Sequence, residues 1–592
     1  MGNCSFPYRT PTSISDEEAA IQMMAETADF KEFTERYSYE TFWKQTEEVS
    51  MEVKNRQDTG DGSKVIKGIP LAEEERPLSL RELRAVGIHI KRRCEDEGWE
   101  DWQGNKLTPD QVTLYDTTKY VIKPYTYKAR KSFVECITSE ARIPDYFVSH
   151  WWGEPVVDFI KCIEQFCRDF NVPDTTTFWI CAYAINQHDI SGDVTNDPSQ
   201  SAFNKAMRLS KGTISILDKG GVVFSRIWCI YELHKTLTAK DEQREFNATW
   251  CIYTAHDHDH VEKWMGQTEK RDAVGLVPGG TVTDIGRQSY TINREQHFPF
   301  QLILSSLKTE ITNAEASVDS DRTHILNAIV GANDLDDVPL QVHDKYVELN
   351  NSLRAYFAIS PRALQGCLEQ KDEVLWKELL MTISKGNMES HLDFDFDDFY
   401  GWKGLTDDKA ANLISSLPTT IPTLGLTNID FDAAFTASLS HYIDQSPKIE
   451  KLKIISAVIY IDGEAGKHFF HTISSSKTIK ELDLGHIDFI TSVDDDRQNE
   501  NEEPTTTRNA KLSDEGLHMI SECIGALNTS LQKVALTNGK FGSNGVRSLK
   551  NALLRNGSIT KVHVSSTADI NDALEEMRQT FKDHNRNIEV RN

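Results

Sequence analysis

The stretch Asp145-Tyr-Phe-Val-Ser-His-Trp-Trp-Gly-Glu-Pro155 decides the fold that we expect in the middle of the chain. Its apolar part, which ends at Ser149, predicts a short strand. Glu154 and Pro155 predict the first turn of a helix, where proline is favoured because its missing N–H would have no partner there. The apolar residues that follow recur at helical spacing: Val156, Ile160, Ile163, Cys167 and Phe170. The stretch therefore predicts a strand that leads directly into a helix.

The same alternation of strand and helix continues along the chain. Phe178–Tyr183 is apolar throughout, which is typical of a strand buried on both faces. A polar loop, 186–199, comes next. It is followed by a helix around Phe203, Met207 and Leu209, a strand at Thr213–Leu217, a helix at Trp228–Leu237 and a strand at Thr249–Tyr253. Short strands that alternate with helices predict an α/β fold with a parallel sheet over residues 143–262.

The C-terminal part of the chain repeats one pattern, apolar-x-x-apolar-x-apolar. It occurs at Ile421–Leu426, Ile449–Ile454, Ile479–Leu484, Leu531–Leu536 and Ile559–Val564. The copies are 28–30 residues apart except for one longer gap, which holds an acidic insertion near 493–510. A short strand plus a helix at this period predicts an α/β repeat solenoid over residues 389–592.

Composition and helical patterns assign the remaining regions. Residues 1–76 form an acidic region that we expect to be partly helical or disordered, and 77–142 a helical, aromatic-rich region that opens with a helix after Ser79. Residues 263–388 form a helical connector. Its expected helices lie at Leu302–Ile311, Asp321–Ile329, Tyr346–Phe357 and Val374–Ile383.

Charge and cysteine usage narrow the possible partners and compartments. The net charge of −26 argues against a nucleic-acid surface, which needs clustered Lys and Arg. The ten cysteines are scattered singly, which suits a reducing compartment and indicates a cytoplasmic protein. No apolar run is long enough to span a membrane. Gly2 and Cys4 would fit a lipid anchor, although Phe6 replaces the usual hydroxyl residue, so membrane association through the N-terminus stays an open alternative.

Three motifs resemble the Toll/interleukin-receptor (TIR) domain. Tyr146–Glu154 is similar to the first strand of plant TIR domains with its Ser-x-x-Gly-Glu turn, and Ser225–Leu233 is similar to their Ser-x-Trp-Cys-x-x-Glu-Leu element. Phe178–Gln187 resembles the Trp-Ile-Asp-Ala-x-x-Ile-Asn-Gln run of the TIR-like heterokaryon-incompatibility domains of fungi. The C-terminal repeats resemble leucine-rich repeats of the ribonuclease-inhibitor type, and the whole arrangement is similar to uncharacterised families of algae and other protists.

This resemblance implies a flavodoxin-like fold and a candidate catalytic residue. In enzymatic TIR domains, the glutamate of the third motif cleaves the nicotinamide–ribose bond of NAD, and Glu232 stands at that position. A carboxylate suits the reaction because the departing nicotinamide leaves an oxocarbenium-like ribose. Helical spacing places Glu232 off the apolar stripe of its helix and on one face with Trp228 and Cys229. The candidate substrate-binding residues are Ser149, Trp151, Trp152, Ser225 and Trp228. NAD is then a substrate, and no cofactor or metal is implied.

Other interpretations remain open. The same architecture without catalysis would be a scaffold that self-associates through its TIR-like part, while the repeats bind a protein or another ligand. A third possibility is an enzyme that removes the base from another nucleotide with the same carboxylate. His256-Asp-His-Asp-His260 suggests a metal, but adjacent side chains cannot easily share one ion, so a solvated loop is favoured. A nucleophilic Cys229 is disfavoured because a cysteine after tryptophan at a helix start is more often simply buried. A Ser149 triad is disfavoured because Ser149-His150 lacks the Gly-x-Ser-x-Gly elbow of hydrolases.

Overall fold

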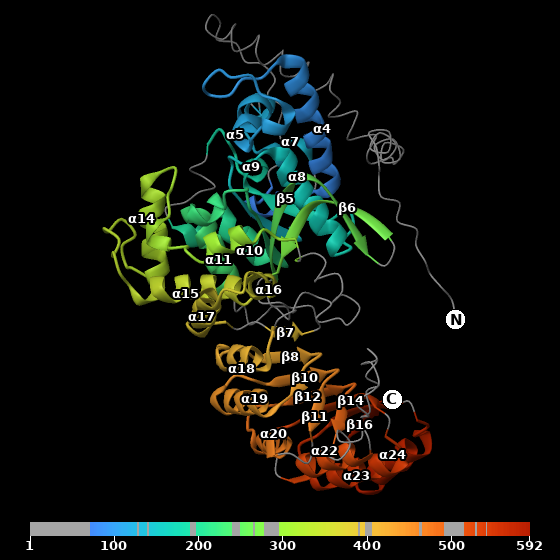
Figure 1. Cartoon of the computed structure of the whole chain (residues 1–592). Coiled ribbons are helices and arrows are strands. Elements are labelled where there is room, and N and C mark those ends of the chain that lie inside the picture. Colours follow the sequence, from blue (N-terminus) through green and yellow to red (C-terminus); the bar gives the residue numbers. More distant parts are fainter. Residues whose placement is uncertain are drawn as a thin grey trace, which may run out of the picture. The chain divides into compact units, whose positions relative to one another are not determined.

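The computed structural model forms two compact units (Figure 1). The N-terminal unit comprises Met1–Val277 and His297–Leu349, and the C-terminal unit comprises Pro278–Gln296 and Asn350–Asn592. The structure describes residues 71–126, 129–138, 141–189, 197–238, 249–264, 267–277, 295, 297–388, 391–396, 405–460, 464–490, 514–526, 530–539, 541–566 and 568–591. The predictions for residues 1–70, the lipid anchor at Gly2 and Cys4 and the acidic insertion near 493–510 lie outside these residues. None of the described helices is long and apolar enough to cross a membrane.

A six-stranded sheet forms the centre of the N-terminal unit, in the order β1-β3-β2-β4-β5-β6. The strands are β1 (Leu78–Ser79), β2 (Tyr146–His150), β3 (Thr177–Ile180), β4 (Gly212–Ile216), β5 (Thr249–Trp264) and β6 (Gln267–Leu276). Strands β3, β2, β4 and β5 are parallel, whereas β1 and β6 pair antiparallel at the two edges. Every residue of β3 and β4 is buried, as expected for strands covered on both faces.

Helices cover both faces of this sheet. Val148 of β2 shares a core with Phe159 of α8 (Val156–Asp169) and Leu83 of α4 (Leu80–Glu97). Its neighbour Phe147 packs in a second core with Phe203 of α10 (Ala202–Leu209). Alternate residues of a strand point to opposite faces, so the two cores lie on opposite sides of the sheet. Among the described residues, the remaining helices of four or more residues that begin in this unit are α5 (Leu114–Thr117), α6 (Lys123–Thr126), α7 (Phe133–Ile137), α9 (Cys181–Ala184), α11 (Ile227–Thr238), α13 (Phe300–Ser306), α14 (Asp319–Val330) and α15 (Asp344–Ala358), together with the π-helical turn η3 (Thr118–Ile122) and the 3-10 helix η6 (Val222–Ser225).

The prediction of a strand at Phe178–Tyr183 is wrong in its second half. Strand β3 ends at Ile180, and Cys181–Ala184 forms the short helix α9. An apolar run cannot distinguish a buried strand from a buried helical turn, because periodicity is absent in both. The sheet also extends beyond residues 143–262, since β1 and β6 add a strand at each edge. The helix predicted after Ser79 is confirmed as α4, which Ser79 and Glu82 begin with a capping box.

The C-terminal unit stacks strands and helices in chain order. Its seven-stranded sheet has the order β16-β15-β14-β12-β10-β8-β7, and every neighbouring pair is parallel. The strands are β7 (His391–Asp395), β8 (Thr423–Thr427), β10 (Lys451–Ile455), β12 (Glu481–Gly485), β14 (Lys533–Gly539), β15 (Lys561–Ser566) and β16 (Glu589–Arg591). A second, three-stranded sheet contains β9 (Asp430–Phe431), β11 (Val458–Tyr460) and β13 (Asp488–Ile490). A strand is therefore confirmed at each copy of the repeated pattern.

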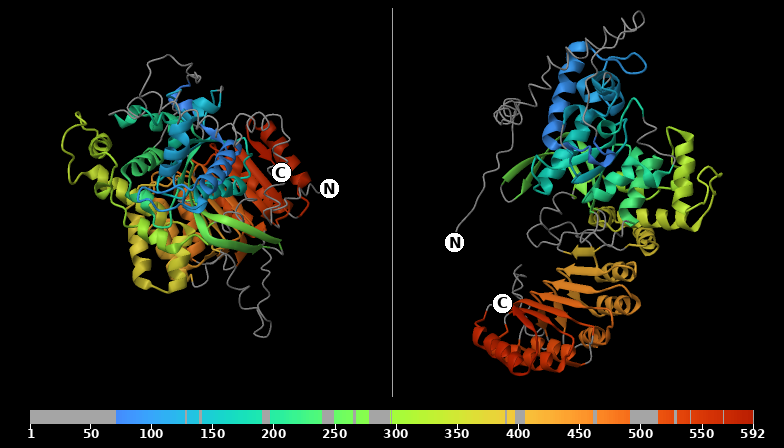
Figure 2. Two further views of the ribbon diagram at one scale, coloured as in Figure 1. Left: turned by 90° about the horizontal axis from the view of Figure 1, so that it is seen from above. Right: turned by 180° about the vertical axis from the view of Figure 1, so that it is seen from behind.

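Helices flank one side of the seven-stranded sheet, as Figure 2 shows. They are α18 (Asp407–Ser415), α19 (Ala433–Gln445), α20 (Glu464–Ser475), α22 (Asp514–Ala526), α23 (Ser543–Arg555) and α24 (Asn571–Asp583), preceded by α16 (Pro361–Gln370) and α17 (Glu373–Ser384). The apolar positions of the pattern line up between strands, as in the buried pair Leu452 and Leu482. The helices predicted in the connector are present as α13, α14, α15 and α17, although α13 ends at Ser306 and α16 was not expected.

Candidate functional site

Five side chains from three separate segments form a buried cluster at the carboxyl end of β2. Ser149 and His150 end β2, Cys181 begins α9 directly after β3, and Cys229 and Glu232 come from α11. The thiol of Cys229 donates to the carbonyl of His150 at 3.6 Å. We call Ser149, His150, Cys181, Cys229 and Glu232 the β2-end cluster. Ligands of open parallel α/β sheets bind at this end of the strands.

One chain of hydrogen bonds orders part of the β2-end cluster. Trp152 Nε1 donates to Cys181 Sγ at 3.1 Å, and Cys181 Sγ lies 3.7 Å from His150 Nε2. His150 Nδ1 lies 3.2 Å from the carbonyl of Val148, so the proton of a neutral imidazole is best placed on Nδ1. Burial lowers the pKa of His150 to about 4, which keeps the ring neutral. Nε2 is then the acceptor for the Cys181 thiol.

Glu232 is almost completely buried, with 4% of its surface exposed. Burial raises the pKa of its carboxyl group to about 8, although nearby Ser149 lowers it in part. Neither Glu232 Oε2 nor Ser149 Oγ makes a hydrogen bond with good geometry. A buried carboxyl group whose pKa is raised by burial is unusual in a stable core and is typical of functional sites.

The expectation that Glu232 lies away from the buried side of its helix is wrong. Helix α11 contacts β2, β4 and β5 as well as α10 and α14, so much of its circumference is covered. Its buried residues include Ile227, Cys229, Ile230, Tyr231, Glu232, Leu233 and Thr236. A position off the apolar stripe therefore faces another element rather than solvent, while the predicted stripe residue Leu237 is only half-buried.

The predicted aromatic and serine contacts divide into two groups. Trp152 lies at the β2-end cluster through its bond to Cys181, and half-buried Trp151 packs over Gly153, where an added Cβ would meet the indole at 2.3 Å. Trp228 instead stacks on Phe203 with ring centroids 4.9 Å apart. Its Nε1 donates to Asp321 Oδ2 at 2.8 Å.

Ser225 is exposed and lies outside the β2-end cluster. Its hydroxyl donates to the carbonyl of Val222 at 2.8 Å, and its own carbonyl accepts the N–H of Glu315, also at 2.8 Å. The structure thus gives Ser225 and Trp228 contacts with residues 315–321, and it brings Ser149 and Trp152 to the end of β2 near Glu232.

Glu154 is a buried acid that was predicted only as the last residue of a turn and the start of a helix. Burial raises its pKa well above the usual value, and the carboxylates of Asp218 and Asp158 add to the effect. Its Oε2 has no hydrogen-bond partner. His150 and Cys181 were also missed as site residues. Their common signal is position, because each lies at or directly after the carboxyl end of a buried strand.

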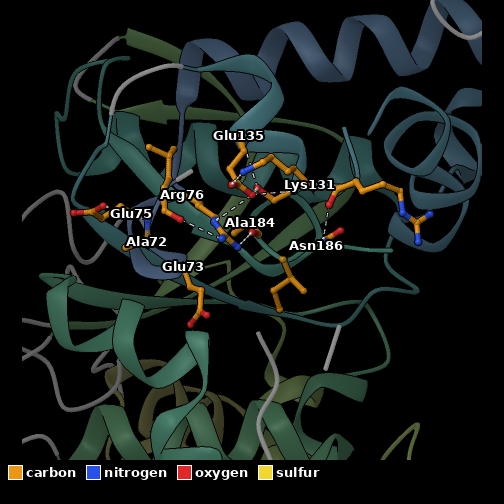
Figure 3. A network of polar contacts seen from close by, with 12 residues as sticks. Ala72, Glu73, Glu75, Arg76, Lys131, Glu135, Ala184 and Asn186 are labelled. Atoms are coloured by element: carbon orange, nitrogen blue, oxygen red, sulfur yellow. Dashed lines mark hydrogen bonds and ion pairs between the residues drawn. The ribbon is translucent and has the colours of Figure 1, made fainter. Parts of the chain in front are cut away.

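A network around Arg76 holds α9 in place from outside the cluster (Figure 3). Arg76 Nη1 donates to the carbonyl of Ala184, the last residue of α9, at 3.3 Å, and Arg76 Nε lies 3.6 Å from Glu135 Oε2. Burial raises the pKa of Glu135, but Arg76, Ser132 and Lys131 outweigh it, so the pKa ends below its usual value. The turn that carries Cys181 is therefore anchored by a charged, buried contact.

Among the residues whose side chains the structure describes, no group of three or more His, Cys, Asp or Glu is placed to hold a metal ion. The side chains of residues 257–260 in the His256–His260 run lie outside that description. Sequence comparison adds no identification, because no family model matches the chain and no curated protein matches it significantly.

Proposed function

We propose that the N-terminal unit is a TIR-like domain that cleaves the nicotinamide–ribose bond of NAD, with Glu232 as its catalytic carboxylate. The observation that carries this proposal is the buried carboxyl group of Glu232 beside Ser149, at the carboxyl end of a central parallel strand. Proteins keep such a desolvated carboxyl group in the interior at a cost in stability, so a functional reason is expected.

The strand order supports a flavodoxin-like domain. Numbered along the chain, the parallel strands β2, β3, β4 and β5 lie in the order 2-1-3-4, which is the flavodoxin-like order. In that fold the ligand binds where connections from neighbouring strands leave in opposite directions, beside the first strand. Strand β2 is the first parallel strand here, and the β2-end cluster is at its carboxyl end.

The reaction needs one ionised carboxylate and a water molecule. The bond between ribose C1′ and the pyridinium nitrogen breaks, and its electron pair stays on the nitrogen, so the cationic ring leaves as neutral nicotinamide. C1′ becomes an oxocarbenium ion, which water captures with loss of a proton. An ionised Glu232 would stabilise the positive charge at C1′. Glu232 is neutral in the empty site at pH 7, and a bound pyridinium ring would favour its ionised form.

Nicotinamide release by the purified full chain tests this proposal. We expect release by the wild type at high protein concentration and a loss of roughly 100-fold or more in Glu232→Gln. The matched control is Glu82→Gln, another buried carboxylate of the same unit, at the start of α4. It should keep the activity if it stays folded, because glutamine also fits the capping box. Equal rates in Glu232→Gln and wild type would exclude Glu232 as the catalytic carboxylate. If the wild type releases no nicotinamide from NAD but cleaves another nucleotide, the substrate proposed here is wrong, whereas the proposed site is retained.

The burial of Glu232 also favours a second candidate function, a scaffold without catalysis. With 4% of Glu232 exposed and Trp228 bonded to Asp321, substrate entry requires a rearrangement that assembly would have to supply. A folded wild-type chain that self-associates in sedimentation experiments but releases no nicotinamide would support this second candidate.

We further propose that the C-terminal unit is a leucine-rich-repeat sensor. Its strands carry a ladder of charged side chains at equivalent positions, where Glu481 pairs with Lys451 at 3.5 Å and also with Lys533. Such a ladder on the face opposite the helices suits a protein or another polar ligand. Ligand binding there would regulate self-association of the TIR-like domain.

A further inference from the structure

An apolar segment of the N-terminal unit projects into solvent between α14 and α15. Val338, Leu340 and Val342 are 87%, 53% and 80% exposed, which is far more than aliphatic side chains usually show. Figures 1 and 2 place this connection at the periphery of the unit, beyond α14. We call Val338–Val342 the exposed aliphatic segment.

Buried polar side chains fix the start of this segment. Asn327 of α14 donates through Nδ2 to the carbonyls of Leu335 at 2.9 Å and Asp337 at 2.6 Å. Buried His324, one turn earlier, has its Nε2 2.8 Å from Asp336 Oδ1. The connection is thus held in shape up to the first apolar residue. A binding segment that is ordered in advance loses less conformational entropy when a partner binds.

The backbone of the exposed aliphatic segment is free to pair with another strand. No backbone–backbone hydrogen bond involves residues 338–342 within the part of the chain that the structure describes. Pro339 favours an extended conformation at Val338. The structure has a bend at Gln341, so pairing with another strand would straighten the segment. In that extended form Val338, Leu340 and Val342 share one face, and their N–H and C=O groups share one edge. Pro339 lacks an N–H group, but its backbone faces the opposite edge, so no hydrogen bond to the partner strand is lost.

The charges around the segment indicate what kind of partner fits. Asp334, Asp337 and Asp344 flank it, while Asp336 contacts His324 and Lys345 Nζ donates to the carbonyl of Val330. The whole chain carries a net charge of −26. Two copies of this surface would bring like charges together, which disfavours self-association here. A partner with a basic rim around an apolar groove is complementary in both respects.

We infer that the exposed aliphatic segment is a docking strand for a second protein, which receives it at a sheet edge beside an apolar groove with a basic rim. Strand addition supplies main-chain hydrogen bonds, and alternate side chains fill the groove. This inference does not depend on NAD cleavage.

The test compares the full chain with the triple variant Val338→Ser, Leu340→Ser, Val342→Ser. These positions are exposed, so the variant should fold normally. The matched control is Val374→Ser with Met381→Ser, which removes other exposed apolar groups, 68% and 53% exposed, on α17. Proteins that the immobilised chains retain from an extract of the source cells are identified. Each candidate partner is then purified and titrated at low and high salt.

The inference predicts one protein that binds wild type and control alike, at least about tenfold more weakly to the triple variant, and more weakly at high salt. It is overturned if no retained protein distinguishes wild type from the triple variant. Retention of another copy of the chain through this segment would also overturn it, because that result would establish self-association instead.

Discussion

At the scale of single residues, the carboxyl group of Glu232 is neutral at pH 7 in the folded chain, because burial raises its pKa to about 8. In the unfolded chain it ionises near its ordinary pKa of about 4.3. Between these two values the folded state holds a proton that the unfolded state has lost. The contribution of Glu232 to the free energy of unfolding therefore falls as the pH rises through this window.

Replacing Glu232 with glutamine should remove this dependence. We expect Glu232→Gln to match wild type near pH 4 and to be more stable above pH 8, by a few kcal/mol as an order of magnitude. Glu135→Gln should behave in the opposite way, because the pKa of Glu135 is lowered and its stabilisation is present above the unfolded pKa. Urea unfolding followed by tryptophan fluorescence at pH 5, 7 and 9 measures the change for Glu232→Gln, and further points between pH 5 and 3 measure the change for Glu135→Gln. A Glu232→Gln difference that does not change with pH would contradict the assigned environment.

The raised pKa of Glu232 also predicts how the proposed NAD cleavage depends on pH. If Glu232 must be ionised in the free enzyme, kcat/KM for NAD rises with pH and levels off above about 8. Initial rates of nicotinamide release across pH 6 to 9 give this profile. A profile that is flat or falls with pH would show that the ionised Glu232 carboxylate is not the form that reacts.

At the scale of elements, the repeats depend on small residues where strands approach one another. Gly425 in β8 lies against Asp393 of β7, and a Cβ there would come within 1.6 Å of Asp393 Oδ1. Gly425→Ala should therefore destabilise the C-terminal unit by about 1–3 kcal/mol. Gly557→Ala is the control, because an added Cβ meets nothing within 4 Å. The unfolding midpoints of the two variants are compared with that of the wild type. Equal midpoints for Gly425→Ala and Gly557→Ala would contradict the packing of Gly425 against Asp393.

Several repeat strands are followed directly by a residue with a left-handed backbone. Ser456, which comes after β10, is one of them and has a φ of 52°. Its N–H donates to the carbonyl of Gly485 in the neighbouring repeat at 2.9 Å, which fixes this conformation. Ser456→Gly should relieve the strain and stabilise the unit by about 0.5–1 kcal/mol. Ser416→Gly, with a φ of −96°, should not stabilise it. A gain in thermal stability for both variants, or for neither, would count against this interpretation.

At the scale of the whole molecule, local sequence patterns predicted the helices and strands well, but they did not predict how these elements pack against one another. The parallel arrangement of β2 to β5 and the stacked repeat strands follow from apolar patterns within short segments. The edge strand β6 was missed because its apolar part, residues 273–277, is short and follows the polar run 267–272. The burial of Glu232 could not be predicted, because it depends on α10 and α14, which pack against α11 from other parts of the chain.

The measurement that tests the central claim most directly is nicotinamide release from NAD by the concentrated full chain at pH 8.5, where half or more of Glu232 should be ionised. Wild type, Glu232→Gln and Glu82→Gln are compared after each is shown to be folded. The proposed function predicts release by wild type and Glu82→Gln and almost none by Glu232→Gln. The same rate in all three folded proteins, or none in any of them, would contradict it.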